Sequence, residues 1–240
     1  MRTSRTPLAE QFAIQILRTC EPFLAKPFVD LRVLDIGCGF GATTLWLAAR
    51  CRSVTGIDPS GRMIEAARAD CHEGGLTGVE FVSCDVLEYT PTEPFDLIVL
   101  DNVFEHLPDQ PATLQRVADW LAPGGVCYLL TPNKLWPIEA HYHLPFLSYL
   151  PLSWANRYLR WSRRGVDYRD SSYAPTYGGL RRLCRNLPGV TAHFVLPADV
   201  RLATRGQSWL YRLGVCLLRR WSGWWWVSKA LLVVLQRTPK

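Results

Sequence analysis

The sequence predicts an α/β fold: a doubly wound, mostly parallel sheet of seven strands that carries a cap insertion. Three observations predict it. Short apolar runs alternate with helical segments up to residue 132, a pattern typical of βαβ units. A glycine-rich turn, 35–41, follows the first apolar run. The 240-residue chain, 48% hydrophobic, is also large enough to bury a core.

The first strand is expected at 32–36, where a short apolar run is stopped by glycines, as suits a buried parallel strand. The next strands along the chain are expected at 53–57, 79–83, 95–100 and, after the turn Pro123-Gly-Gly125, 126–130. The helices expected in this region are 8–20, 43–50, 60–71 and 111–121.

The regular alternation ends after residue 132. Residues 133–175 are rich in Pro, Trp, Tyr and His, and we interpret them as a substrate cap over the active edge of the sheet. A helix over 176–187 is followed by expected strands at 190–196 and 231–236, with an apolar and basic insertion at 206–229 between them. The chain is therefore expected to be one domain, 1–240, whose cofactor-binding core is 30–132.

Charge and tryptophan are distributed unevenly. Residues 1–150 carry 11 Lys/Arg and 18 Asp/Glu, a net charge of −7, whereas residues 151–240 carry 16 and 3, a net charge of +13. Seven of the ten tryptophans also lie after residue 150. The last third of the chain is therefore expected to contact a different partner from the rest.

The cysteines and the N-terminus favour a cytoplasmic protein. The eight cysteines form no Cys-x-x-Cys pair and most lie in apolar runs, which favours reduced core thiols over zinc or disulfides. Arg2 and Arg5 are followed by Glu10, Gln11 and Gln15, which interrupt any apolar core of a signal peptide.

The turn at 35–41 indicates a cofactor site, since Gly37, Gly39 and Gly41 allow a ligand to approach the backbone closely. This motif alone is ambiguous, because Gly37, Gly39 and Ala42 also fit a dinucleotide fingerprint. Asp58, after the second strand, can accept both ribose hydroxyls in either case. Asp35 favours S-adenosylmethionine (SAM), because a carboxylate would repel a pyrophosphate and attract the ammonium group of SAM.

These segments resemble the class I SAM-dependent methyltransferases, especially the ubiquinone-biosynthesis-like O-methyltransferase group. The matching pieces within about 30–132 are Val33–Gly41, Gly56–Ser60 with Met63-Ile64, Phe95–Ile98, Glu105-His106 and Pro123–Gly125. The resemblance implies that Asp35 and the glycines hold the methionine end, Asp58 the ribose and Asp85 the adenine. The residues expected to bind the cofactor are Asp35, Gly37, Cys38, Gly39, Gly41, Asp58, Pro59, Met63, Asp85, Val86 and Asn102.

The segment 101–106 follows the fourth strand, at the edge where doubly wound sheets bind ligands. If 102–107 begins a helix, Asn102, Glu105 and His106 share one face. His106 is the preferred general base for a hydroxyl acceptor, because histidine has an ordinary pKa of about 6.5. Glu105, His141 and His143 complete the candidate catalytic set, and the alternative is that Glu105 and His106 only order a loop.

A metal-dependent reaction is the other option at this site. Small-RNA ribose methyltransferases use Glu-x-x-Glu-His and a distant histidine to bind a divalent ion, and this chain resembles that motif with Asn102 in place of the first Glu. His141 or His143 could supply the distant ligand. Because Mg²⁺ prefers anionic oxygen ligands, we predict that no metal is bound.

The stretch 206–229 predicts contact with a membrane surface. Trp and Arg flank a Leu- and Val-rich run, 213–218, that is far shorter than the ~20 residues needed to span a bilayer. Trp154 and Trp161, with Arg163 and Arg164, repeat the pattern in the cap. A dimer interface and a buried helix remain alternatives. Binding of nucleic acid is disfavoured, because the apolar side chains of 213–218 make no favourable contact with phosphates.

The sequence therefore predicts SAM-dependent methyl transfer to a hydroxyl of a small or lipid-linked acceptor. The enzyme would be cytoplasmic and peripheral on the inner face of the membrane. An RNA ribose or base methyltransferase is the alternative function, and the oligomeric state is left open.

Overall fold

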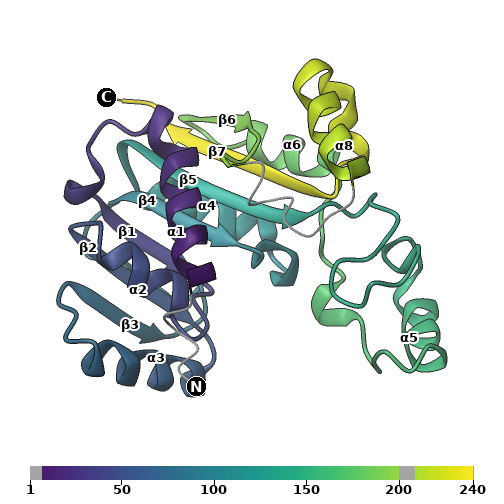
Figure 1. The fold of residues 1–240 in the computed structure, drawn as a ribbon, viewed down its shortest axis with the longest axis horizontal. Helices are drawn as coiled ribbons and strands as arrows, with labels where there is room; N and C mark the ends of the chain where they lie inside the picture. Colours follow the sequence, from purple (N-terminus) through teal and green to yellow (C-terminus); the bar gives the residue numbers. More distant parts are fainter. Residues whose placement is uncertain (1–6, 200–208, 240) are drawn as a thin grey trace.

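The fold is a single seven-stranded sheet covered by helices, in a computed structural model that describes residues 7–199 and 209–239 (Figure 1). The strands lie in the order β3-β2-β1-β4-β5-β7-β6. They are β1 Arg32–Ile36, β2 Ser53–Asp58, β3 Val79–Ser83, β4 Phe95–Asp101, β5 Leu121–Pro132, β6 Val190–Phe194 and β7 Ala230–Arg237. The first five are parallel, and β7 is antiparallel to both neighbours. The predicted fold class is confirmed.

The helices expected at 8–20, 43–50, 60–71, 111–121 and 176–187 occur in that order, and further helices lie within 133–175 and 206–229. These helices are α1 Pro7–Cys20, α2 Ala42–Ala48, α3 Gly61–Glu73, α4 Gln110–Trp120, α5 Leu152–Trp161, α6 Tyr177–Arg185 and α8 Trp209–Arg220. Helix α6 begins where the sequence predicts it, because the Thr176 side chain accepts a hydrogen bond from the backbone N–H of Gly179 at 3.0 Å.

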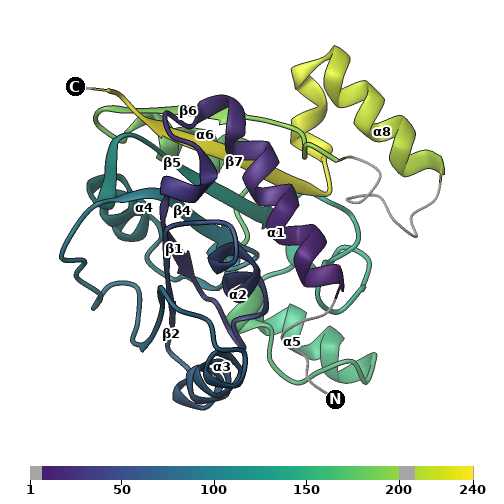
Figure 2. The same cartoon turned by 60° about the vertical axis from the view of Figure 1, so that its left-hand side comes forward.

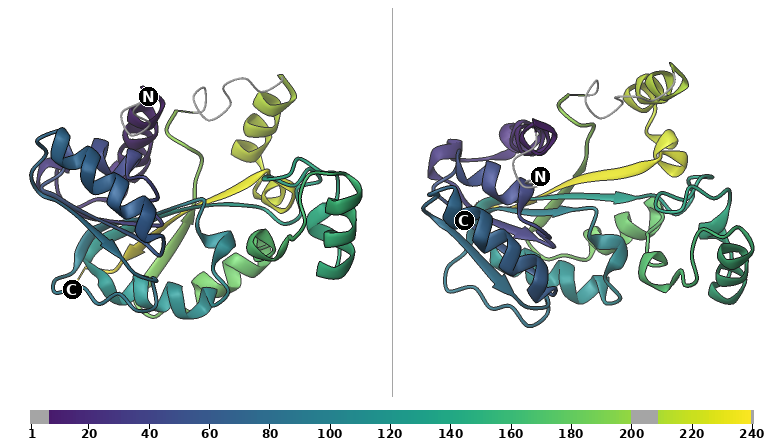
Figure 3. Two further views of the ribbon diagram at one scale, coloured as in Figure 1. Left: turned by 90° about the horizontal axis from the view of Figure 1, so that it is seen from below. Right: turned by 60° about the horizontal axis from the view of Figure 1, so that its bottom comes forward.

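Two hydrophobic layers cover the faces of the sheet. Alternate strand residues point to opposite sides. Leu34, Ile98 and Cys127 pack with α4 and α6, whereas Val33, Leu97 and Val126 pack with α1 and α2. Figure 2 shows α1 crossing one face, and the two views of Figure 3 show α4 and α6 below the sheet. This burial on both faces explains why the strands are continuous apolar runs in the sequence.

Strand β5 is longer than predicted. The turn at Pro123-Gly-Gly125 was expected to precede the strand but lies within it, where the pairing with β4 shifts register between Phe95 and Leu97. A Cβ at Gly125 would lie 2.9 Å from the carbonyl oxygens of Ala122 and Phe95, so only glycine fits this irregularity.

The Trp-rich insertion contains an α-helix followed by a 3-10 helix. Helix α8 ends at Arg220, and Trp221 has extended backbone angles before the 3-10 helix η6, Ser222–Val227. Trp225 is buried in the main core, whereas Trp209, Trp221 and Trp224 are exposed. Residues 206–208 lie outside the described part of the chain. In the described part no helix is long and apolar enough to cross a membrane.

Candidate active site

The glycine-rich loop after β1 is shaped by backbone angles that favour glycine. Gly37, Gly39 and Gly41 all have positive φ. The N–H groups of Gly37 and Cys38 both donate to the carbonyl oxygen of Ile57, at 2.8 and 3.1 Å, which ties the half-buried Cys38 and the loop to β2. The loop is therefore held close to the carboxyl end of the neighbouring strand.

Each glycine is required for a different reason. A Cβ at Gly37 would collide with Val103, and one at Gly41 would collide with Phe81. At Gly39, by contrast, the nearest atom would be the sulfur of Met63, at 3.9 Å. Gly39 thus faces open space, as a position beside a ligand should, and Met63 borders the same space.

Asp58 organises this loop from the end of β2. Its Oδ2 accepts a hydrogen bond from the N–H of Gly39 at 3.0 Å, and its Oδ1 accepts one from the N–H of Ser60 at 2.8 Å. Pro59 between them is exposed. A carboxylate oxygen has more than one lone pair, so Asp58 can still accept hydrogen bonds from a ribose. The sequence suggested only the ligand-binding role and not this second one.

The buried carboxyl groups beside the loop form an acidic cradle. Asp35 accepts a hydrogen bond from the hydroxyl of Thr44 at 2.6 Å. Burial, with smaller contributions from the charges of Asp101 and Asp58, raises the pKa of Asp35 to about 7. Burial likewise raises the pKa of Asp101 to about 6. Ionising these buried carboxyl groups is unfavourable unless a positive charge lies beside them. They therefore suit a cationic ligand, and their negative charge would repel a pyrophosphate.

The remaining residues predicted to bind the cofactor lie at the ends of β3 and β4. Asp85 is exposed and accepts a hydrogen bond from the N–H of Leu87 at 2.8 Å, while Val86 is buried. Asn102 has φ of 55° and donates from its amide to Asp101 at 2.8 Å. The helix expected over 102–107 is only the 3-10 helix η3, Phe104–His106, so Asn102 lies outside it.

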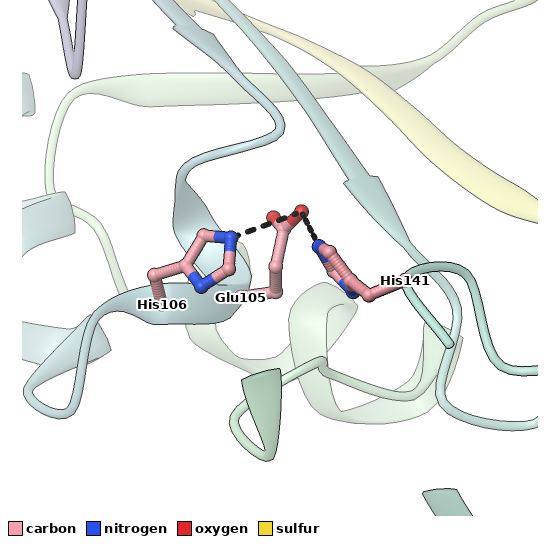
Figure 4. Close-up of side chains that lie close together, drawn as sticks. All are labelled: Glu105, His106 and His141. Carbon is pink, nitrogen blue, oxygen red and sulfur yellow. Dashed lines mark ion pairs between the residues drawn. The ribbon is translucent and has the colours of Figure 1, made fainter. Parts of the chain in front are cut away.

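Glu105, His106 and His141 come together beside the carboxyl end of β4 (Figure 4). Glu105 is fully buried, and its Oε2 accepts a hydrogen bond from the hydroxyl of Thr131 at 3.0 Å. Its Oε1 is buried without a hydrogen-bond partner and faces both histidines, with Nε2 of His106 at 4.0 Å and Nε2 of His141 at 3.9 Å. Burial raises the pKa of Glu105.

The other ring nitrogen of each histidine is anchored. Nδ1 of His106 lies 2.9 Å from the carbonyl oxygen of Asp170, which can only accept, so this nitrogen carries the proton and donates it. Nε2 of His106 is then the basic atom that faces the site. Nδ1 of His141 lies 3.0 Å from Oε1 of Glu139, and this hydrogen bond raises the pKa of His141.

Glu139 is a site residue that the sequence analysis missed. It is buried, and its Oε2 also accepts hydrogen bonds from the N–H groups of His141 and Tyr142, at 2.8 and 2.6 Å. A carboxylate that binds both the ring and the backbone fixes the orientation of His141. The spacing Glu-x-His was the only signal in the sequence, and by itself it is weak.

His143 has a different environment from His141. Its backbone N–H donates to the carbonyl oxygen of Glu139 at 3.0 Å, but its side chain is exposed and lies outside the cluster of Figure 4. The cap therefore brings one of its two candidate histidines to the site.

The same cluster is the set of side chains in the described part of the chain that could hold a metal ion. One ligand atom from each of Glu105, His106 and His141 lies within 4.8 Å of the other two. The unpartnered Glu105 Oε1 and the two Nε2 atoms around it fit a proton or a small cation. One carboxylate is a poor match for Mg²⁺, so the absence of a metal requirement stays a prediction.

Parts of the chain are similar to known methyltransferases. Residues 33–125 match the family model of a methyltransferase domain. The chain is 33% identical, over 60% of its length and 53% of the relative's, to a ubiquinone biosynthesis O-methyltransferase of Rhodopseudomonas palustris. It is 38% identical, over 43% and 40%, to a trans-aconitate 2-methyltransferase of Rhizobium etli. The chain spans about half the length of these curated relatives or less.

Solved structures share the fold over nearly the whole chain. The plantazolicin methyltransferase BpumL, solved with S-adenosylhomocysteine, superimposes with a TM-score of 0.61 at 18% identity, over 97% of this chain and 85% of that one. The family and such neighbours indicate SAM as the cofactor. Residues 33–125 therefore match a methyltransferase domain, and the solved methyltransferases share the fold of nearly the whole chain.

Proposed function

We propose that this protein transfers a methyl group from SAM to a hydroxyl group of a small or lipid-linked acceptor at the cytoplasmic face of a membrane. The observation that supports a hydroxyl acceptor is the tautomer of His106. Its proton is held on Nδ1 by the carbonyl of Asp170, so a basic Nε2 faces the carboxyl edge of the sheet.

Each residue has a role in this proposal. Asp35 and the glycines of the loop bind the methionine end, Asp58 binds the ribose and Asp85 the adenine. When bound, SAM supplies an electrophilic methyl group, so the protein need only align the acceptor, exclude water and remove the acceptor's proton. His106 takes that proton. Glu105 and His141 orient the acceptor beneath the cap, 133–175, and the carboxylate of Glu105 stabilises the imidazolium that forms on His106.

The membrane part of the proposal rests on the exposed face of α8 and η6. Trp209, Leu213 and Trp221 are exposed there, and Arg219 and Arg220 add positive charge. Tryptophan and arginine together suit a helix lying among anionic headgroups. Trp225 is buried in the core, so the large apolar side chains that the described residues of this region expose for contact are Trp209, Leu213, Trp221, Trp224, Trp226 and Val227. RNA is disfavoured as the partner, since the exposed apolar side chain of Leu213 makes no favourable contact with phosphates.

The relatives leave the acceptor atom open, because one is named for O-methylation in ubiquinone biosynthesis and another for trans-aconitate. A direct experiment is to supply SAM with a labelled methyl group and follow its transfer to lipid and water-soluble fractions of a cell extract. We expect label in the lipid fraction, on an oxygen. Label only in water-soluble carboxylic acids or in RNA would reject the proposed acceptor class.

Calorimetry tests the cofactor separately. The protein should bind SAM and S-adenosylhomocysteine, and it should not bind NAD, because the acidic cradle at Asp35 repels a pyrophosphate. Binding of NAD in place of SAM would overturn the assignment.

A further inference from the structure

Helix α5 in the cap has one buried side and one exposed side. The exposed side belongs to none of the hydrophobic cores formed by the described residues. Ala155 and Leu159, four residues apart, are fully buried and pack against Leu144, Leu147 and Tyr168. These residues form a small core of their own, separate from the two layers on the sheet. The helix is thus firmly held by its inner side, and its outer side is free to contact a partner.

The outer side carries two of the most exposed tryptophans in the described chain. Trp154 is 69% exposed and Trp161 is 81% exposed. A spacing of seven residues puts them on the same side of the helix, about 10 Å apart along its axis. Exposed apolar side chains gathered on one surface, unlike single scattered ones, mark sites of contact with a protein or a membrane. A flat partner could contact both tryptophans at the same depth.

The charge around these tryptophans is mainly positive, with Asp167, which accepts a hydrogen bond from Asn156 of α5, as the nearest acidic residue along the chain. Arg157, Arg160, Arg163 and Arg164 are all exposed, and residues 151–166 contain no Asp or Glu. None of the four arginines is in an ion pair with a described residue. Two copies of this surface would bring arginine against arginine, which disfavours pairing with a second chain. The charge is complementary to an anionic partner.

The position of α5 relative to α8 distinguishes between two kinds of anionic partner, a lipid bilayer and RNA. Figures 1 and 3 show α5 and α8 both beyond the carboxyl ends of β4 and β5, on opposite sides of the edge that carries the candidate site. Helix α8 exposes Leu213, and η6 after it exposes Val227, as well as tryptophan. Aliphatic groups gain nothing from phosphates but insert readily among lipid chains. A bilayer is therefore favoured over RNA.

We propose that the α5 face, made of Trp154, Arg157, Arg160, Trp161, Arg163 and Arg164, docks on an anionic lipid bilayer. The tryptophans lie at the level of the headgroups, and the arginines contact lipid phosphates. With α8 on the other side, the carboxyl edge of the sheet faces the membrane between two anchors. If the proposed methyl transfer holds, its acceptor is then an amphiphile that enters the site from that bilayer.

Vesicle flotation tests this surface without any acceptor. The full chain should float with vesicles of phosphatidylglycerol and phosphatidylcholine and much less with phosphatidylcholine alone. The double variant Trp154→Ser/Trp161→Ser should lose at least ten-fold in apparent affinity, while SAM binding by calorimetry is unchanged. The pair Arg157→Gln/Arg163→Gln should weaken binding several-fold and reduce its dependence on salt. Val29→Ser is the matched control, because Val29 is 67% exposed at the opposite edge, before β1, and should float like the wild type.

Several results would overturn the inference. They are failure of the wild type to float with anionic vesicles, wild-type flotation of the double tryptophan variant, and salt-sensitive binding to an RNA oligonucleotide that needs the same tryptophans. Self-association that the double variant abolishes would also overturn it. Lipid binding without methyl transfer would reject the proposed function but leave the docking surface standing.

Discussion

The two ends of the chain differ in charge and in what they place at the site. Residues 1–150 have a net charge of −7 and supply the acidic cradle, whereas residues 151–240 have a net charge of +13 and supply the exposed tryptophan and arginine surfaces. The acidic part is suited to a cationic cofactor. The basic part is suited to an anionic surface. The regions expected to bind the cofactor and the partner thus differ in charge as well as in their position along the chain.

The candidate active site lies where these two regions meet. Glu105 and His106 come from the segment after β4, and His141 with its carboxylate partner Glu139 comes from the cap. Asp170, beyond α5, anchors the ring of His106 through its carbonyl. A change in the cap should therefore alter the acceptor chemistry without altering SAM binding, and the predictions below test that separation.

The largest expected effect is on the cofactor side. Gly39→Val should abolish detectable SAM binding, because the side chain would fill the open space that the loop leaves for the ligand. Gly75→Val is the matched control, since Gly75 has a similar φ of 59° and nothing within 4 Å of an added Cβ. Calorimetry with SAM and thermal unfolding separate loss of the site from loss of the fold. Equal SAM affinities for the two variants would contradict the assignment of the loop at Gly39 to the cofactor site.

The contrast between the regions also explains what the sequence could predict. The loop of Gly37, Gly39 and Gly41 and the carboxylates Asp35 and Asp58 follow strands directly, so local pattern and sheet topology locate them. Contacts such as Glu139 with His141, or Asp170 with His106, depend on how the cap folds, and residue types alone do not encode them. Asn102 was misplaced because a left-handed backbone angle ends the expected helical face.

The next effect concerns the base. His106→Ala should lower turnover by about 10², the usual contribution of a general base, while SAM affinity changes little. His72→Ala is the control, because His72 is exposed near the end of α3. Steady-state transfer of labelled methyl groups measures turnover. A variant with near-normal turnover would make His106 a structural residue and move proton transfer to the cap side of the site.

A smaller effect should appear in the pH dependence of SAM binding. With a pKa of about 7 in the free protein, the carboxyl of Asp35 is mostly protonated at pH 6, and the cation must displace that proton. Affinity should therefore be about five-fold weaker at pH 6 than at pH 7, a range in which an α-ammonium group stays charged. Calorimetry in buffers of different ionisation enthalpy would count the released proton. Asp35→Asn should bind SAM more weakly and lose this dependence; a variant that keeps it would assign the proton elsewhere.

The smallest expected effect is that of removing divalent metal. His106 and His141 present Nε2 atoms to a single carboxylate, and the position that would supply a second one is Asn102, whose amide is bound to Asp101. With so few anionic oxygen ligands, Mg²⁺ should bind weakly, and turnover should be nearly unchanged after dialysis against a chelator. Turnover with and without added Mg²⁺, Mn²⁺ or Zn²⁺ measures this. A complete loss that one of these ions restores would mean that the cap and the cofactor half meet around a metal ion, and Asn102→Glu should then tighten its binding.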